Sequence, residues 1–113
     1  MRNLFGRKDK LKKKSEIDQI LKKGRKFDCL TFKILYARNN EKNDRLGILV
    51  SKKIGNAVIR NKTKRIFREI FRKIRNKYPP FFDVLIQPRP GIDLKSNEEV
   101  EKCFEKWKNI LKN

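Results

Sequence analysis

The side chains of this 113-residue chain that could do chemistry are mainly cationic. There are 32 Lys and Arg residues against 13 Asp and Glu residues, which gives a net charge of +19, and there is no His. The absence of His removes the commonest general base and the commonest zinc ligand. Acids of the last third such as Asp83, Asp93, Glu98 and Glu101 are scattered. The sequence therefore predicts binding of a polyanion, with nucleic acid as the first candidate and an anionic membrane surface as the second.

The positive charge is concentrated in two blocks of the chain. Residues 1–26 have a net charge of +8 and residues 52–77 have +10, whereas residues 27–51 have +1 and residues 78–113 are neutral. A surface that is only solvated would mix both signs along the whole chain. The segregation indicates that the N-terminal and central blocks contact the polyanion.

The central block reads as a long amphipathic helix over residues 56–77. Apolar residues recur at a 3.6 period on one face: Ile59, Ile66, Phe67, Ile70, Phe71 and Ile74. The opposite face carries Asn61, Lys64, Arg65, Arg68, Arg72 and Arg75, with Arg60 at its edge. The planar guanidinium of Arg matches pairs of phosphate oxygens. Just upstream, Lys52 and Lys53 precede Gly55-Asn56, where the N–H groups of a helix start favour a phosphate.

Five further elements are predicted around this helix. A short helix over 15–23 would be capped by Ser15 and ended by Gly24, and residues 1–10 would form a flexible basic arm. Alternating strands over 27–38 and 45–51 would form a hairpin, with Leu30, Phe32, Ile34 and Tyr36 on one face. Pro79-Pro80 would precede a strand over 81–87. A last helix over 96–112 would start with a capping box of Ser96 and Glu99 and bury Val100, Phe104, Trp107 and Leu111. The order α-β-β-α-β-α predicts one two-layer α+β domain over residues 1–113.

The remaining features point to a reduced, aqueous compartment. No segment has the roughly 18 apolar residues needed to cross a bilayer, and the N-terminus has no apolar core of a signal peptide. Cys29 and Cys103 are far apart in sequence and form no ligand motif, so they are expected to be two small buried residues with free thiols. These features predict a cytoplasmic protein.

The central block also resembles a family signature. The run from Lys53 to Arg65 matches the pattern K-x-G-x-A-x-x-R-N-x-x-K-R of bacterial ribonuclease P protein subunits at every fixed position, and Phe67-Arg68-Glu69 follows it. The resemblance extends more loosely over the rest of the chain. It implies a holoenzyme that removes the 5′ leader of precursor tRNA by hydrolysing one phosphodiester bond. The RNA subunit would carry the chemistry with Mg²⁺ that it mainly holds itself.

The resemblance further implies how the chain would act. The sheet would be covered by the long basic helix, with an unusual left-handed crossover. That helix would meet the catalytic RNA through Lys52, Lys53, Asn56, Arg60, Asn61, Lys64, Arg65, Arg68 and Arg72. A cleft between the first helix and the sheet would take the leader of precursor tRNA, with Ile17, Leu21, Lys33, Leu35, Lys53, Arg60 and Asn61 lining it. No protein partner and no membrane would be required.

One departure and three alternatives accompany this interpretation. Ile17, Leu21 and Leu35 stand where many relatives have aromatic residues, so leader bases would be packed rather than stacked. The basic surface would equally suit a ribosomal protein. A nuclease with its own active site would need His or clustered carboxylates. A membrane-surface protein would use the amphipathic helix, whose apolar face is needed to cover the sheet.

Overall fold

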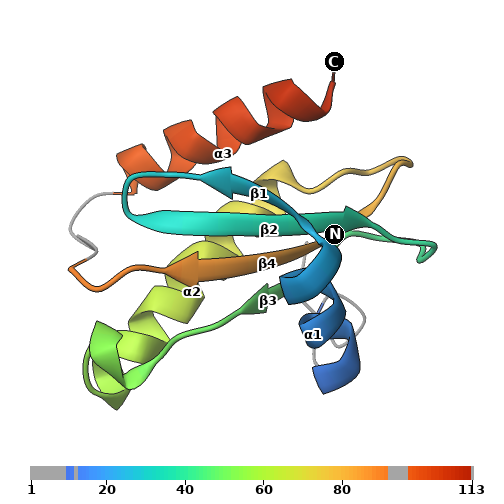
Figure 1. Cartoon of the computed structure of the whole chain (residues 1–113). Coiled ribbons are helices and arrows are strands. Elements are labelled where there is room, and N and C mark those ends of the chain that lie inside the picture. Colours follow the sequence, from blue (N-terminus) through green and yellow to red (C-terminus); the bar gives the residue numbers. More distant parts are fainter. Residues whose placement is uncertain (1–9, 12, 92–96, 113) are drawn as a thin grey trace, which may run out of the picture.

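The computed structural model describes residues 10–11, 13–91 and 97–112, which form a four-stranded sheet with helices on both faces (Figure 1). The α+β prediction is confirmed. The elements in chain order are α1 (Lys14–Lys23), β1 (Arg25–Asp28), β2 (Phe32–Arg38), β3 (Arg45–Ile48), the 3₁₀ turn η2 (Lys52–Ile54), α2 (Ala57–Ile74), β4 (Phe82–Pro88) and α3 (Glu98–Leu111).

The strand order in the sheet is β1-β2-β4-β3, and it corrects the predicted hairpin. β2 pairs antiparallel with both β1 and β4, whereas β3 pairs parallel with β4. The predicted pairing of strands 27–38 and 45–51 is therefore wrong. The physical reason is that β4 is buried on both faces over residues 82–86, so it takes the central position that a half-exposed strand could not.

The predicted strand over 27–38 is in fact two strands. The chain turns between β1 and β2, and the Cys29 N–H donates to the Phe32 carbonyl oxygen at 2.9 Å. Leu30 lies in this turn and is 82% exposed, so its predicted place on the buried face is also wrong. From Phe32 onward the predicted alternation is correct, since Phe32, Ile34 and Tyr36 are buried in one core.

Two cores lie on the two faces of the sheet. The larger one packs the buried stripes of α2 and α3 against β2 and β4, and the predicted α3 stripe of Val100, Phe104 and Trp107 lies in it, with Leu111 partly buried beside it. The smaller one joins Leu11 and Ile20 to Leu35 and Leu85, so α1 covers part of the second face. In Figure 1, α2 lies behind the sheet, β3 and β4 both point left, and β4 lies above β3. The crossover is therefore left-handed, as the resemblance implies, against the usual preference.

The helix ends differ in part from their predictions. Ser15 is not a cap, because α1 begins at Lys14 and its N-cap is Lys13, which makes no side-chain bond. Gly24 does end α1, and its N–H donates to the Ile20 carbonyl oxygen at 2.8 Å. α2 begins one residue later than predicted and ends at Ile74 rather than 77. Ser96, the predicted cap of α3, lies outside the described residues.

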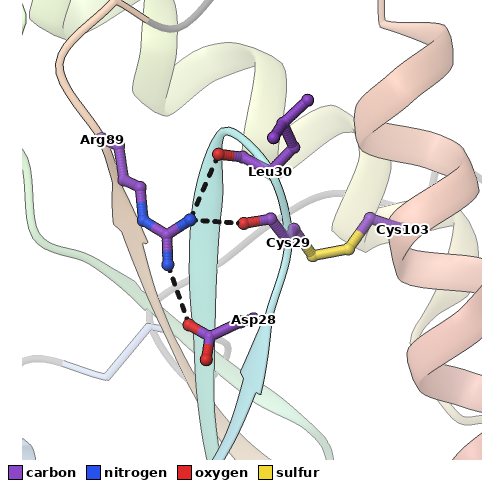
Figure 2. The surroundings of a disulfide bond; sticks show 5 residues. All are labelled: Asp28, Cys29, Leu30, Arg89 and Cys103. Carbon is purple, nitrogen blue, oxygen red and sulfur yellow. Dashed lines mark hydrogen bonds and ion pairs between the residues drawn. A yellow bond between two sulfur atoms is a disulfide. The ribbon is translucent and has the colours of Figure 1, made fainter.

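The prediction of two free thiols is contradicted by the structure. Cys29, in the β1–β2 turn, and Cys103, on α3, form a disulfide between Cα atoms 6.1 Å apart (Figure 2). The separation of 74 residues in sequence concealed this proximity, which arises because α3 runs along β2 and its first turns lie beside the β1–β2 turn. The disulfide thus links the turn to the helix layer.

The predicted basic arm is described only at its end. Residues 1–9 lie outside the described residues, but Lys10 forms a parallel bridge with Leu46 and is therefore attached to the sheet. Leu11 follows it into the smaller core, with its N–H bonded to the Leu46 carbonyl oxygen at 2.9 Å. Within the described part of the chain, no helix is both long and apolar enough to span a bilayer.

Candidate RNA-binding surface

The helix α2 separates its apolar and cationic side chains onto opposite faces. Its buried residues are Thr63, Ile66, Phe67, Ile70 and Phe71, and the Thr63 hydroxyl donates to the Ile59 carbonyl oxygen at 2.8 Å. This pairing lets a polar side chain lie inside the core. Ile59, predicted to be buried, is 39% exposed because the first turn of α2 projects beyond the sheet.

The predicted RNA-binding side chains lie on the opposite face of α2. Asn61 and Arg65 are exposed, and Lys64, Arg68 and Arg72 are half-buried along their stems. Such burial leaves the charged ends in water, because long cationic side chains pack their methylene groups on the protein and extend their heads outward. Glu69 is the one acid within α2. The face therefore offers guanidinium and ammonium groups to a polyanion.

The segment before α2 is shaped by a glycine and a cap. Gly55 has φ 149°, and a Cβ there would lie 3.0–3.1 Å from three atoms of the Ile59 side chain, so only glycine fits without strain. Asn56 is the N-cap, with its Oδ1 accepting from the Ile59 N–H at 3.0 Å. Asn56 therefore has a structural task besides its predicted one. The 3₁₀ turn η2 holds Lys52 and Lys53 in exposed positions beside this helix start.

Arg60 is the most constrained of the predicted cationic residues. Its side chain is half-buried, and its Nε is buried without an acceptor among the described residues. Burial of an unpaired donor costs free energy. Because this Nε has almost no contact with solvent, an external anion could reach it only after the side chain moves.

A hollow of about 570 Å³ opens on the sheet face that α1 leaves uncovered. It is lined by Lys33, Leu49, Val50, Ser51, Gln87, Pro88, Arg89 and Pro90. Lys33 is the only predicted cleft residue in this lining. Sequence reasoning missed the other lining residues because only the pairing of β2 with β4 brings Gln87 beside Lys33, its register partner.

Leu35 does not line this hollow, and its prediction as a cleft residue is wrong. It is 2% exposed and packs with Leu11, Ile20 and Leu85 in the core between the sheet and α1. The space between the first helix and the sheet is thus filled by side chains. Ile17 packs half-buried against the same core, and Leu21 is 37% exposed. The hollow lies beside α1 rather than beneath it.

Arg89 connects the hollow to the disulfide-linked turn. Its Nη1 donates to the Cys29 carbonyl oxygen at 2.6 Å and to that of Leu30 at 3.2 Å, and its Nη2 pairs with the Asp28 carboxylate at 2.8 Å (Figure 2). Its backbone N–H also donates to the Thr31 carbonyl oxygen. Four contacts to one turn fix the position of this hollow wall.

The acids Glu16 on α1 and Asp83 on β4 form ion pairs within the protein. Arg45 pairs with Glu16 and with Asp83, both at 2.8 Å, and the hydrogen bonds that its guanidinium donates to Asp83 raise the pKa of Arg45 further above its ordinary value. Among the described residues, no group of three or more Asp, Glu, Cys or His side chains could hold a metal ion.

Comparisons with known proteins agree with this geometry. The sequence model of the family described as Ribonuclease P matches residues 5–112. The ribonuclease P protein component of Desulfotalea psychrophila is 40% identical over 78% of this chain and 73% of its own, and that of Thermotoga petrophila is 37% identical over 99% and 97%. The solved structure of the Staphylococcus aureus RNase P protein is 32% identical, covers 92% of this chain and 95% of that one, and has a TM-score of 0.76. This chain belongs to the bacterial ribonuclease P protein family.

Proposed function

We propose that this protein is the accessory subunit of a ribonuclease P holoenzyme. It binds the catalytic RNA through the cationic face of α2 and holds the 5′ leader of precursor tRNA in the hollow beside Lys33. The RNA subunit hydrolyses the phosphodiester bond with Mg²⁺ that it mainly holds itself. The absence of a carboxylate cluster among the described residues supports this division of labour.

The observation that carries the proposal is the cationic face of α2. The family signature begins in η2 and continues along the outer face of α2, while the inner face is buried. A membrane-surface role is not supported, because the apolar stripe that would enter lipid is part of the core. A ribosomal role is not supported either, since the relatives are ribonuclease P proteins.

The leader hollow is supported by its location and lining. The hollow adjoins residues 49–51, which lead into η2. An RNA leader bound in the hollow would therefore continue toward Lys53 and Arg60. Its lining contains aliphatic and polar side chains without an aromatic ring. Leader recognition would then rest on phosphate contacts and packing, which read sequence weakly. Lys33→Gln should accordingly weaken holoenzyme binding of precursor tRNA several-fold and leave binding of mature tRNA unchanged, whereas Lys102→Gln on the exposed face of α3 should affect neither.

The test of the α2 face is the salt dependence of binding to ribonuclease P RNA. Arg65→Glu combined with Arg68→Glu should weaken binding and reduce the log–log slope by roughly 0.7–0.9 per lost phosphate contact. The matched control is Lys102→Glu with Lys106→Glu, which changes the net charge equally on the exposed face of α3. Equal slopes for the two double variants would contradict the proposed contact.

A further inference from the structure

A second hollow, of about 530 Å³, lies at the other end of β2. Three cations line it, Lys23 at the end of α1, Arg25 on β1 and Arg38 at the end of β2, and all three are exposed. Its other walls are mainly apolar and come from the start of β4 and the end of α3. The hollow therefore combines positive charge with an apolar surface.

The three cations have no ion pair within the described part of the chain. Two acids, Glu16 and Asp83, line a neighbouring hollow together with Lys23 and Arg38. Both carboxylates are bonded to Arg45 at 2.8 Å, and Asp83 also accepts from the Asn39 side-chain amide at 2.7 Å. Arg45 also pairs with Glu41, so its single charge is shared by three carboxylates and does not fully neutralise them. Lys23, Arg25 and Arg38 are not paired with these acids and line the second hollow, where they can attract an external anion.

The apolar walls give the hollow a second kind of contact. Pro80 is exposed and Ile110 is 48% exposed, while the rings of Tyr36 and Phe82 form a buried floor. A free phosphate would use only the cations and leave these walls wet. A nucleotide has both an anionic phosphate and a flat base with little charge, so it matches both parts of the surface.

The hollow is separate from the proposed leader site. Lys33 lines the leader hollow and Arg38 lines this one, and five residues of extended strand between them span roughly 17 Å. The pairing of β2 with β4 also separates the two hollows, because Phe32 pairs with Pro88 at the end of β4 and Arg38 pairs with Phe82 at its start. A change in one hollow therefore need not disturb the other.

We propose that this hollow is a second RNA-binding site, which holds one nucleotide of a single-stranded segment. Lys23, Arg25 and Arg38 contact the phosphates, and Pro80, Ile110 and Leu111 pack against the base. The inference rests on the proposed function for the nature of the partner. The segment belongs either to the catalytic RNA or to precursor tRNA, and the chemistry of recognition is the same for both.

The first test uses the only Trp of the chain as a local probe. Trp107 packs edge-on against Tyr36 and Phe82, with ring centroids 5.4 and 6.4 Å apart, so its indole N–H resonance reports on the floor of the hollow. A single-stranded uridine hexamer should shift this resonance in the wild-type protein. Arg25→Gln with Arg38→Gln should weaken the titration several-fold, whereas Lys26→Gln with Lys106→Gln removes the same charge elsewhere and should not.

The second test uses the same variants in the holoenzyme. Arg25→Gln with Arg38→Gln should reduce the affinity for ribonuclease P RNA, or that of the holoenzyme for precursor tRNA, at least three-fold more than the control pair does. Whichever of the two affinities is reduced identifies the RNA that supplies the nucleotide. Equal behaviour of both pairs in every titration would overturn the second site. Failure of the wild-type protein to bind ribonuclease P RNA at all would instead overturn the proposed function.

Discussion

Side chains on one face of β2 differ in function because α1 covers only part of that face. Lys33 and Leu35 lie on the same face, two residues apart, yet Lys33 lines the leader hollow and Leu35 is 2% exposed under α1. The position of α1 decides which of the two can meet a ligand. Their spacing in the sequence indicates a common face of the strand, but it does not indicate how far α1 extends over that face.

Truncation should distinguish the buried side chain from its exposed neighbour on α1. Leu35→Ala should lower the free energy of unfolding by about 2–4 kcal/mol, because it leaves a cavity in the smaller core. Leu21→Ala removes the same atoms from a side chain that is 37% exposed and should cost less than about 1 kcal/mol. Urea unfolding of the two variants measures both values, and similar losses would show that Leu35 is not a core residue.

Asp44 is a buried carboxylate that joins the segment before β3 to both ends of the connection between α2 and β4. Its oxygens accept from the backbone N–H groups of Asn76 and Phe82, both at 2.7 Å, and the Asn76 side chain accepts in turn from Lys108 of α3. Burial raises the pKa of Asp44, and the two N–H groups and the charges of Lys108 and Arg75 oppose this rise. Burial likewise lowers the pKa of Lys108.

The raised pKa of Asp44 predicts a pH dependence of stability. Folding favours the protonated carboxyl, so its contribution is complete below the ordinary pKa of 3.8 and is lost as pH rises through the raised value. Asp44→Asn cannot titrate at this position. The free energy of unfolding of the wild-type protein minus that of Asp44→Asn should therefore fall as pH rises from about 4, then become constant. Urea unfolding over a pH series measures it, and a difference that increases with pH would contradict the assignment.

The β1–β2 turn and α3 behave as one unit because the disulfide and Arg89 both hold the turn. The Cys29–Cys103 bond closes a loop with a sequence separation of 74 residues, which contains β2, β3, α2 and β4. A cross-link over a long loop restricts the unfolded chain more than the folded one. The helix layer and the hollow wall are therefore connected through this turn.

Reduction of this bond should destabilise the protein without abolishing its fold. The expected loss in the free energy of unfolding is roughly 2–5 kcal/mol, and the length of the closed loop favours the upper part of this range. Urea unfolding with and without a thiol reductant measures the loss, and Cys29→Ser with Cys103→Ser is the control that should not respond to reductant. An unchanged midpoint for the wild-type protein would mean that the bond does not stabilise the fold.

The helices could be predicted from the sequence, whereas the strand pairing could not. The 3.6 period of α2 and α3 gave their buried stripes, because a helix determines its own faces. The pairing partner of β3 is β4, which lies more than 30 residues later in sequence, and no local pattern encodes that pairing. The same limit hid the leader hollow, since Gln87 and Arg89 reach Lys33 only through the pairing of β2 with β4.

The whole molecule carries its charge in a way that suits a scaffold between two RNA molecules. A net charge of +19 on a body with a radius of gyration of 13.4 Å repels itself, and a bound polyanion would relieve this repulsion. The cationic face of α2, the leader hollow and the second hollow lie on different elements, so several RNA segments could be held at once. Salt should weaken all three contacts together.

The most direct test of this account is reconstituted leader removal at low Mg²⁺. The purified protein together with ribonuclease P RNA should cleave precursor tRNA to the mature 5′ end at Mg²⁺ concentrations at which the RNA alone is nearly inactive. The protein alone should not cleave at any Mg²⁺ concentration, because its described residues contain no carboxylate cluster and the chain has no His. Turnover by RNA-free protein, or no stimulation of the RNA by the protein, would contradict the account.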